Sequence, residues 1–162
     1  MRGRAARAAV LATLLYPFAA GAASIGWVYS SDVDPMTDLR RAYVIAHTDH
    51  NADAAFSCHS DGTAFFVADG SRLDFSLDSA RTVAVRFDNL PPINMVWRSS
   101  SKGGVIIIGK DALAMAWAIA NAHERIVIDT GNGGPAVYSV AGAAIGVQQA
   151  LGTCGIPYGP PK

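Results

Sequence analysis

The stretch Thr82-Val83-Ala84-Val85-Arg86-Phe87-Asp88 is the clearest structural signal in this sequence of 162 residues. Val83, Val85 and Phe87 recur at every second position, which is the period of a β-strand that lays one face on a core. The residues between them are expected on the opposite face. The stretch therefore predicts a strand, and the pattern on either side of it decides the rest of the fold.

Similar short runs lie on both sides of this strand. Asp61-Gly62 separates two of them and is a typical hairpin signal, the polar Ser30–Pro35 stretch has turn chemistry, and the glycine-rich segment 130–134 connects one strand to another. The runs predict further strands at Trp27–Tyr29, Arg41–Thr48, Ala55–Cys58, Phe65–Val67, Ile93–Trp97, Val105–Ile108, Ile126–Ile128 and Ala136–Val140.

Two helices are predicted late in the chain. The alanine-rich segment 111–122 has Asp111 as its expected N-cap, and a second helix is expected from Ala143 to Leu151, ending at Gly152 with Cys154 just beyond it. Strands in succession with helices concentrated late indicate an α+β fold, with a largely antiparallel sheet or sandwich, two late helices and one disulfide.

The first 23 residues have the three parts of an export signal. Arginines precede position 8, an apolar run extends from Ala8 to Ala20, and the small residues Gly21-Ala22-Ala23 follow. The alternative is a retained membrane anchor, but the run is shorter than the roughly 20 residues that a spanning helix needs, and Pro17 interrupts it. We expect cleavage before Ser24 and no stable membrane insertion afterwards.

The mature chain is expected to work in the periplasm or as a secreted protein. Residues 24–156 are predicted to form a single globular domain and residues 157–162 a flexible tail. Three of the 13 basic residues lie in the signal, so 10 basic and 13 acidic residues remain, a net charge of −3. This balance excludes a nucleic-acid partner.

The two cysteines, Cys58 and Cys154, lie near opposite ends of the mature domain. Export places them in an oxidising compartment, which favours a disulfide. Its loop of almost 100 residues has a value of up to about 4–5 kcal/mol in the chain-entropy model. The alternative is a thiol nucleophile or a redox pair, for which the C-x-x-C spacing is lacking.

Imidazoles and a carboxylate gather at His47, Asp49 and His50, which are residue types that bind zinc or copper. Positions 47 and 49 share a strand face and position 50 does not. A site would therefore need a loop here and a further ligand, such as His59 or His123. The alternative, which we favour, is a polar loop between strands with no metal and no cofactor.

Other candidate chemistry also favours a structural interpretation. The chain has no G-x-S-x-G elbow, and the spacing of its serines, histidines and aspartates specifies no triad. Trp27, Trp97 and Trp117 lie within apolar patterns and are expected in the core. We therefore expect no enzymatic activity.

Several short elements occur in a characteristic order. They are Trp27–Ser31, Asp34–Asp38, Cys58, Val85–Asp88, Trp97–Ser100, Val137–Gly142 and Cys154. This order resembles the VasI (TagO) family of type VI secretion-associated exported proteins, or a related family of periplasmic domains. The resemblance implies a periplasmic accessory protein without a catalytic centre, and it supports the pairing of Cys58 with Cys154.

The sequence thus predicts a monomeric, non-enzymatic accessory or binding protein that contacts an envelope protein or a cell-wall component. Arg86, Asp88 and Arg98 are the candidate partner-binding residues; the alternative is a cross-strand salt-bridge network. Two other functions stay open. One is a small exported enzyme or metal-binding protein that uses the histidine cluster at 47–50, and the other is a periplasmic inhibitor or immunity protein.

Overall fold

The computed structural model describes residues 26–48, 53–69 and 79–160. The predicted signal, 1–23, lies outside these residues. Within them, nine strands form one sheet in the order β1-β2-β3-β4-β7-β6-β5-β8-β9, and every neighbouring pair is antiparallel. The elements are β1 Val28–Val33, β2 Arg40–His47, β3 Asp53–His59, β4 Ala64–Ala68, β5 Ser79–Phe87, β6 Ile93–Ser99, β7 Val105–Ile108, α1 Lys110–Ala120, β8 Arg125–Asp129, β9 Ala136–Ser139 and α2 Ala143–Cys154. The predicted α+β class with an antiparallel sheet and two late helices is confirmed.

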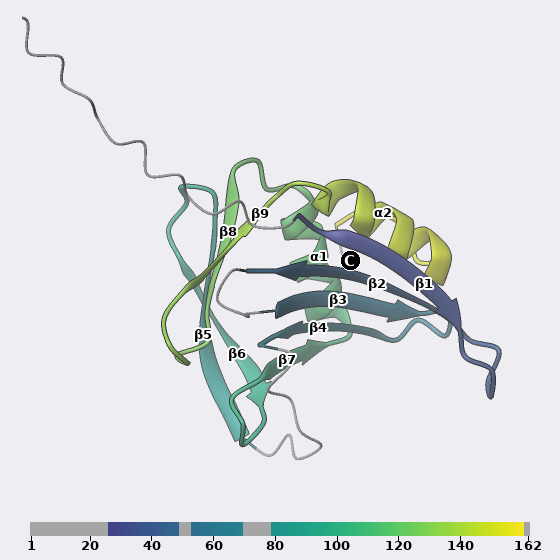
Figure 1. Cartoon of the computed structure of the whole chain (residues 1–162), viewed down its shortest axis with the longest axis horizontal. Coiled ribbons are helices and arrows are strands. Elements are labelled where there is room, and N and C mark those ends of the chain that lie inside the picture. Colours follow the sequence, from purple (N-terminus) through teal and green to yellow (C-terminus); the bar gives the residue numbers. More distant parts are fainter. Residues whose placement is uncertain (1–25, 49–52, 70–78, 161–162) are drawn as a thin grey trace, which may run out of the picture.

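The sheet bends where β6 meets β7. These strands pair only at Arg98 with Ile106 and at Ser99 with Val105, whereas β5 and β6 pair along seven positions. Such a short ladder lets the two parts of the sheet diverge. Figure 1 shows β5 and β6 running steeply across the direction of β2, β3 and β4. We call β1, β2, β3, β4 and β7 the first half, and β5, β6, β8 and β9 the second half.

The core lies between the first half and the two helices, which Figure 1 shows on one side of these strands. We call this side the inner face. Val44, Phe56 and Phe66 point into it and are fully buried. Helix α2 approaches closely because Gly146 has no side chain: a Cβ there would lie 2.8 Å from Val44 Cγ1.

The predicted disulfide is confirmed. Cys58 on β3 is bonded to Cys154 in the last turn of α2, with their Cα atoms 6.1 Å apart. The hydroxyl of Tyr29 on β1 also contacts that of Thr153, at 2.7 Å. These contacts fasten the end of α2 to the inner face.

Strands of the second half also pack against this core. Trp97 on β6 packs edge-to-face on Phe66, with ring centroids 5.7 Å apart, and Trp27 contacts both Phe66 and Tyr138. Trp27 also donates its backbone N–H to the carbonyl of Ala141, at 2.7 Å. The segment before β1 is thereby joined to the segment after β9. Trp27 and Trp97 are buried, as predicted.

The N-cap of helix α1 lies two residues before the predicted one. It is Gly109 rather than Asp111, which lies in the first turn. The N–H of Gly109 bonds to the carbonyl of Ala64 on β4, at 2.8 Å, so the chain must turn directly after β7. A φ of 63° makes this turn, and glycine adopts that angle without strain.

The bounds of two other elements also differ from the prediction. Helix α2 continues through Gly152 to Cys154 because the left-handed residue that ends it is Gly155, with φ 70°. Strand β1 extends to Val33 because the polar Ser30–Pro35 stretch, predicted as a turn, pairs along β2 for most of its length.

The C-terminal tail packs on the helices as far as it is described. The ring of Tyr158 lies 4.9 Å from that of Trp117, a half-buried residue of α1. Residues 157–160 of the predicted flexible tail therefore lie against the domain. Within the described ranges, none of the helices has the length and apolar character to cross a membrane.

Candidate functional site

The side of the first half that faces away from the helices, its outer face, is unusually apolar. Directly paired residues of antiparallel strands project to the same face. The register therefore places Val28, Ile45, Ala55, Val67 and Ile106 in one row across five strands. Val28 is 56% exposed, and the other four are half-buried among their neighbours.

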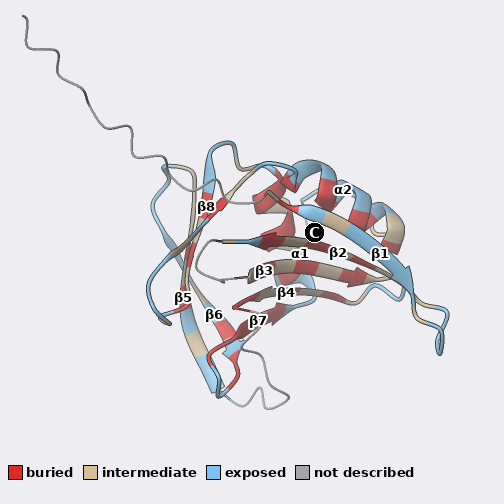
Figure 2. Cartoon of the chain, viewed as in Figure 1, coloured by how far each residue is buried: buried red, intermediate tan, exposed pale blue. Residues whose placement is uncertain are grey.

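A second row lies beside the first and consists of Ser30, Tyr43, Ser57, Phe65 and Ile108. Ile108 is 51% exposed. Figure 2 shows buried and half-buried residues alternating along β2 and β3, and the half-buried ones belong to the outer face. The two rows together define the outer-face patch, in which eight of ten residues are apolar or aromatic. Antiparallel sheets usually present polar residues on a face that no other layer covers.

Our sequence reasoning missed this patch, although the chain contains a signal for it. Phe65-Phe66-Val67 and Val105–Ile108 are continuously apolar, without the alternating polar residues of a half-exposed strand. Such runs are typical of strands buried on both faces. In this fold the helices cover only one face of these strands, so the other apolar residues reach the surface.

Charged residues border the patch at one end. Arg41 bonds to Asp32 at 2.8 Å and to Asp34 at 3.1 Å. The hydrogen bond to Asp32 raises the pKa of Arg41. The pKa of Asp34 is lowered, chiefly because its carboxylate accepts the backbone N–H of Met36.

At the opposite end, His47 Nδ1 lies 2.6 Å from the Asp53 carboxylate. Both ends of the patch thus carry polar side chains that are paired within the chain. An apolar centre with a polar rim is the usual anatomy of a protein–protein interface.

The three predicted partner-binding residues do not form one group. Arg98 pairs with Ile106 at the margin of the outer-face patch. Arg86 lies six residues along β5 from Ala80, the residue opposite Arg98, a separation of about 20 Å. The Nε of Arg86 is buried without a hydrogen-bond partner.

Asp88 lies in the turn after β5 and has a positive φ of 51°. Its carboxylate accepts the backbone N–H groups of His123, Glu124 and Arg125, at 2.7–3.2 Å. These bonds, that from Glu124 foremost, lower the pKa of Asp88. Its carboxylate therefore orders the segment that leads into β8.

Part of the predicted metal cluster, Asp49 and His50, lies outside the described residues. His47 and His59 are at opposite ends of the β2–β3 ladder, about 20 Å apart, and His123 lies beside Asp88. In the ranges that the structure describes, no three His, Cys, Asp or Glu side chains are grouped as a metal ion would require.

Buried polar residues gather at one end of the interior, where the loops after β4, β6 and β8 meet. Thr130 donates its hydroxyl to Asp69 at 2.6 Å, and Arg81 donates to the carbonyl of Thr130 and to the side chain of Asn132. Asn132 in turn donates to the carbonyl of Gly103. The glycine-rich turn is therefore held in place by hydrogen bonds to its neighbours.

Comparisons with family models, with curated proteins and with solved structures gave no match for this chain.

Proposed function

We propose that this chain is a non-enzymatic exported accessory protein that binds another protein of the cell envelope through the outer-face patch. One observation carries the proposal: five neighbouring strands present two rows of mainly apolar side chains on a face that neither helix covers and on which no other described element is layered. Contiguous apolar surface of this kind on a soluble domain typically marks an interaction site.

The chemistry of the patch favours a protein partner whose own surface is apolar at its centre. Arg41 is paired with both Asp32 and Asp34, and His47 lies against the Asp53 carboxylate, so at each end the basic side chain already has an acidic partner within the chain and is a poor contact for a polyanion. Only three of the ten residues of the patch, Ser30, Tyr43 and Ser57, have a hydrogen-bonding side chain that a glycan could use. We therefore favour an envelope protein over a cell-wall polymer.

The size of the patch bears on affinity. Ten residues are about a third to a half of the roughly 20–30 per side in a standard interface. The rim, including Arg98 beside Ile106, would have to contribute to a stable complex. We therefore expect a transient complex, consistent with an accessory role; the resemblance to VasI suggests type VI secretion machinery as the source of the partner.

A matched pair of variants tests the proposal. Val28→Asp with Ile108→Asp places two carboxylates in the patch, at positions 56% and 51% exposed. Val96→Asp with Val137→Asp places two on strands of the second half, at positions 73% and 51% exposed. Residues 24–162 of each form are used to capture crosslinked partners from an envelope fraction, and the affinity for the captured protein is then measured.

We expect the wild type and the second-half variant to bind the same protein, and the patch variant to bind it at least about tenfold more weakly. Equal binding by all three forms would show that the outer-face patch is not the interface. Light scattering of the purified protein provides a further check. A wild-type dimer that the patch variant abolishes would identify a second copy of this chain, rather than an envelope protein, as the occupant.

A further inference from the structure

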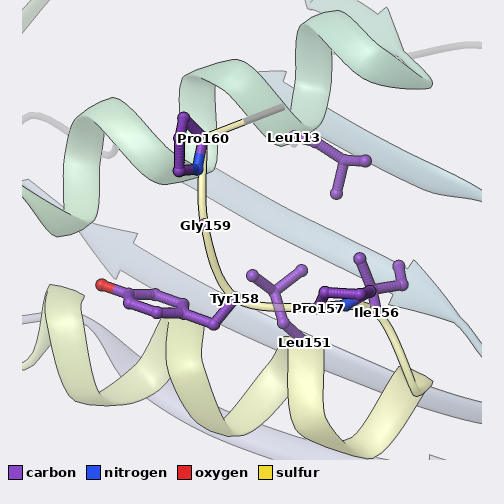
Figure 3. A pocket seen from close by; sticks show the side chains of 7 residues that line it. All are labelled: Leu113, Leu151, Ile156, Pro157, Tyr158, Gly159 and Pro160. Atoms are coloured by element: carbon purple, nitrogen blue, oxygen red, sulfur yellow. The ribbon is translucent and has the colours of Figure 1, made fainter. Parts of the chain in front are cut away.

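Helices α1 and α2 and the C-terminal tail enclose a pocket of about 540 Å³. Figure 3 shows the tail passing between the two helices, with the lining side chains gathered around the space. The pocket lies on the helix side of the sheet, away from the outer-face patch. Its lining residues are Leu113, Leu151, Ile156, Pro157, Tyr158, Gly159 and Pro160.

We propose that this pocket binds the aliphatic chain of a small amphiphile. Its volume lies within the roughly 300–1,000 Å³ of small-molecule sites, which are mostly apolar. None of its seven lining residues carries a charge, so a charged head group would remain at the mouth. The walls are mostly aliphatic, and the one aromatic ring, of Tyr158, already packs on Trp117. The surface thus suits a chain better than a stacked ring.

The wall formed by the tail is held where it begins and again at Tyr158. Cys154, which precedes it, is bonded to Cys58 in the sheet, and the N–H of Ile156 donates to the carbonyl of Leu151 at 2.9 Å. Further along, the ring of Tyr158 packs on that of Trp117. Prolines at 157 and 160 restrict the backbone between and beyond these anchors. A wall fixed in this way limits the ordering cost of ligand binding.

The binding experiment uses two uncharged probes with the mature protein, residues 24–162. The first probe is laurdan, an uncharged naphthalene fluorophore that carries a lauroyl chain, and the second is a series of n-alkanols of about six to twelve carbons that compete with it. We expect saturable binding at one site. Alkanol affinity should rise about fourfold with each added methylene and then level off when the pocket is full.

Leu113→Trp and Ile145→Trp form the matched pair. Leu113 is half-buried and lines the pocket, so a larger ring there should occupy the space and weaken probe binding at least about tenfold. Ile145 is 66% exposed on α2 and does not line the pocket, so its variant should bind as the wild type does. Leu113→Lys provides a second test that places a charge in the pocket if the tryptophan variant fails to fold.

Two results would overturn the proposal. One is the absence of saturable probe binding by the folded wild type. The other is equal binding by folded Leu113→Trp or Leu113→Lys protein, which would place the probe elsewhere. The Val28→Asp, Ile108→Asp protein distinguishes this site from the outer-face patch, because it should retain the full affinity for the probe.

Discussion

The two faces of the first half have similar compositions but different surroundings. Phe65 and Phe66 are neighbours on β4, yet Phe66 is fully buried between Trp27 and Trp97, whereas Phe65 is half-buried on the outer face. The helices cover the first of these faces and leave the second open. Apolar composition alone therefore does not distinguish the core from a binding surface. The position of the second layer makes that distinction.

Replacing each phenylalanine in turn gives the most direct test of this comparison. Phe66→Ala should lower the free energy of unfolding by about 3–5 kcal/mol, because it leaves a cavity beneath two tryptophans. Phe65→Ala should change it by less than about 1 kcal/mol but weaken binding of the envelope partner. Urea denaturation and the partner-affinity assay measure the two effects. Similar losses of stability in both variants would mean that the outer face is covered in the free protein.

The disulfide fastens α2, which covers the inner face, to β3. Replacing both Cys58 and Cys154 by alanine should lower the free energy of unfolding by about 2–4 kcal/mol, because the cross-link no longer restricts the conformations of the unfolded chain. Both residues are almost fully buried. Alanine is preferred to serine because it leaves no buried hydroxyl without a partner. Unchanged stability would indicate that packing alone holds α2 in place.

Two glycines of α2 test the closeness of the helix to the inner face. Gly146→Ala directs a methyl group at Val44, whose side chain is stiff and fully buried, and overpacking of this kind costs about 1–3 kcal/mol. Gly152→Ala meets nothing within 4 Å and should stabilise the helix by about 0.5–1 kcal/mol. The melting temperature should therefore fall for Gly146→Ala and rise for Gly152→Ala. A gain in both variants would contradict close packing at Gly146.

The sequence predicts the strands well because their residues alternate or form apolar runs between strong turn signals. Asp61-Gly62 is an example, since the hairpin predicted there joins β3 to β4. The ends of the helices are less predictable. Gly152 and Gly155 are equally suitable stops in the sequence, and only the later one has the left-handed conformation.

The candidate site was harder to predict because it depends on strand register and on which face is covered. Arg86, Asp88 and Arg98 are near each other in the sequence. Yet antiparallel pairing separates the two arginines by about 20 Å, and Asp88 faces the backbone of the segment before β8. The outer-face patch combines residues from five strands, from Val28 to Ile108. No local window of the sequence contains them together.

Replacing Asp88 should have the smallest effect on stability. Unlike the side chains of the open patch, its carboxylate already accepts hydrogen bonds within the chain. Its folded-state pKa is lowered by backbone N–H donors, Glu124 first, so the charged form stabilises the fold. This stabilisation is present above the unfolded pKa, near 3.9, and is lost as the pH falls through the lower folded-state pKa. Asp88→Asn preserves the shape and tolerates the positive φ of this turn.

The melting temperature of the Asp88→Asn variant should fall below that of the wild type at neutral pH and converge with it in acid, while partner binding stays unchanged. A constant difference at every pH, or a loss of partner affinity without a loss of stability, would instead favour a direct role for Asp88 at the interface.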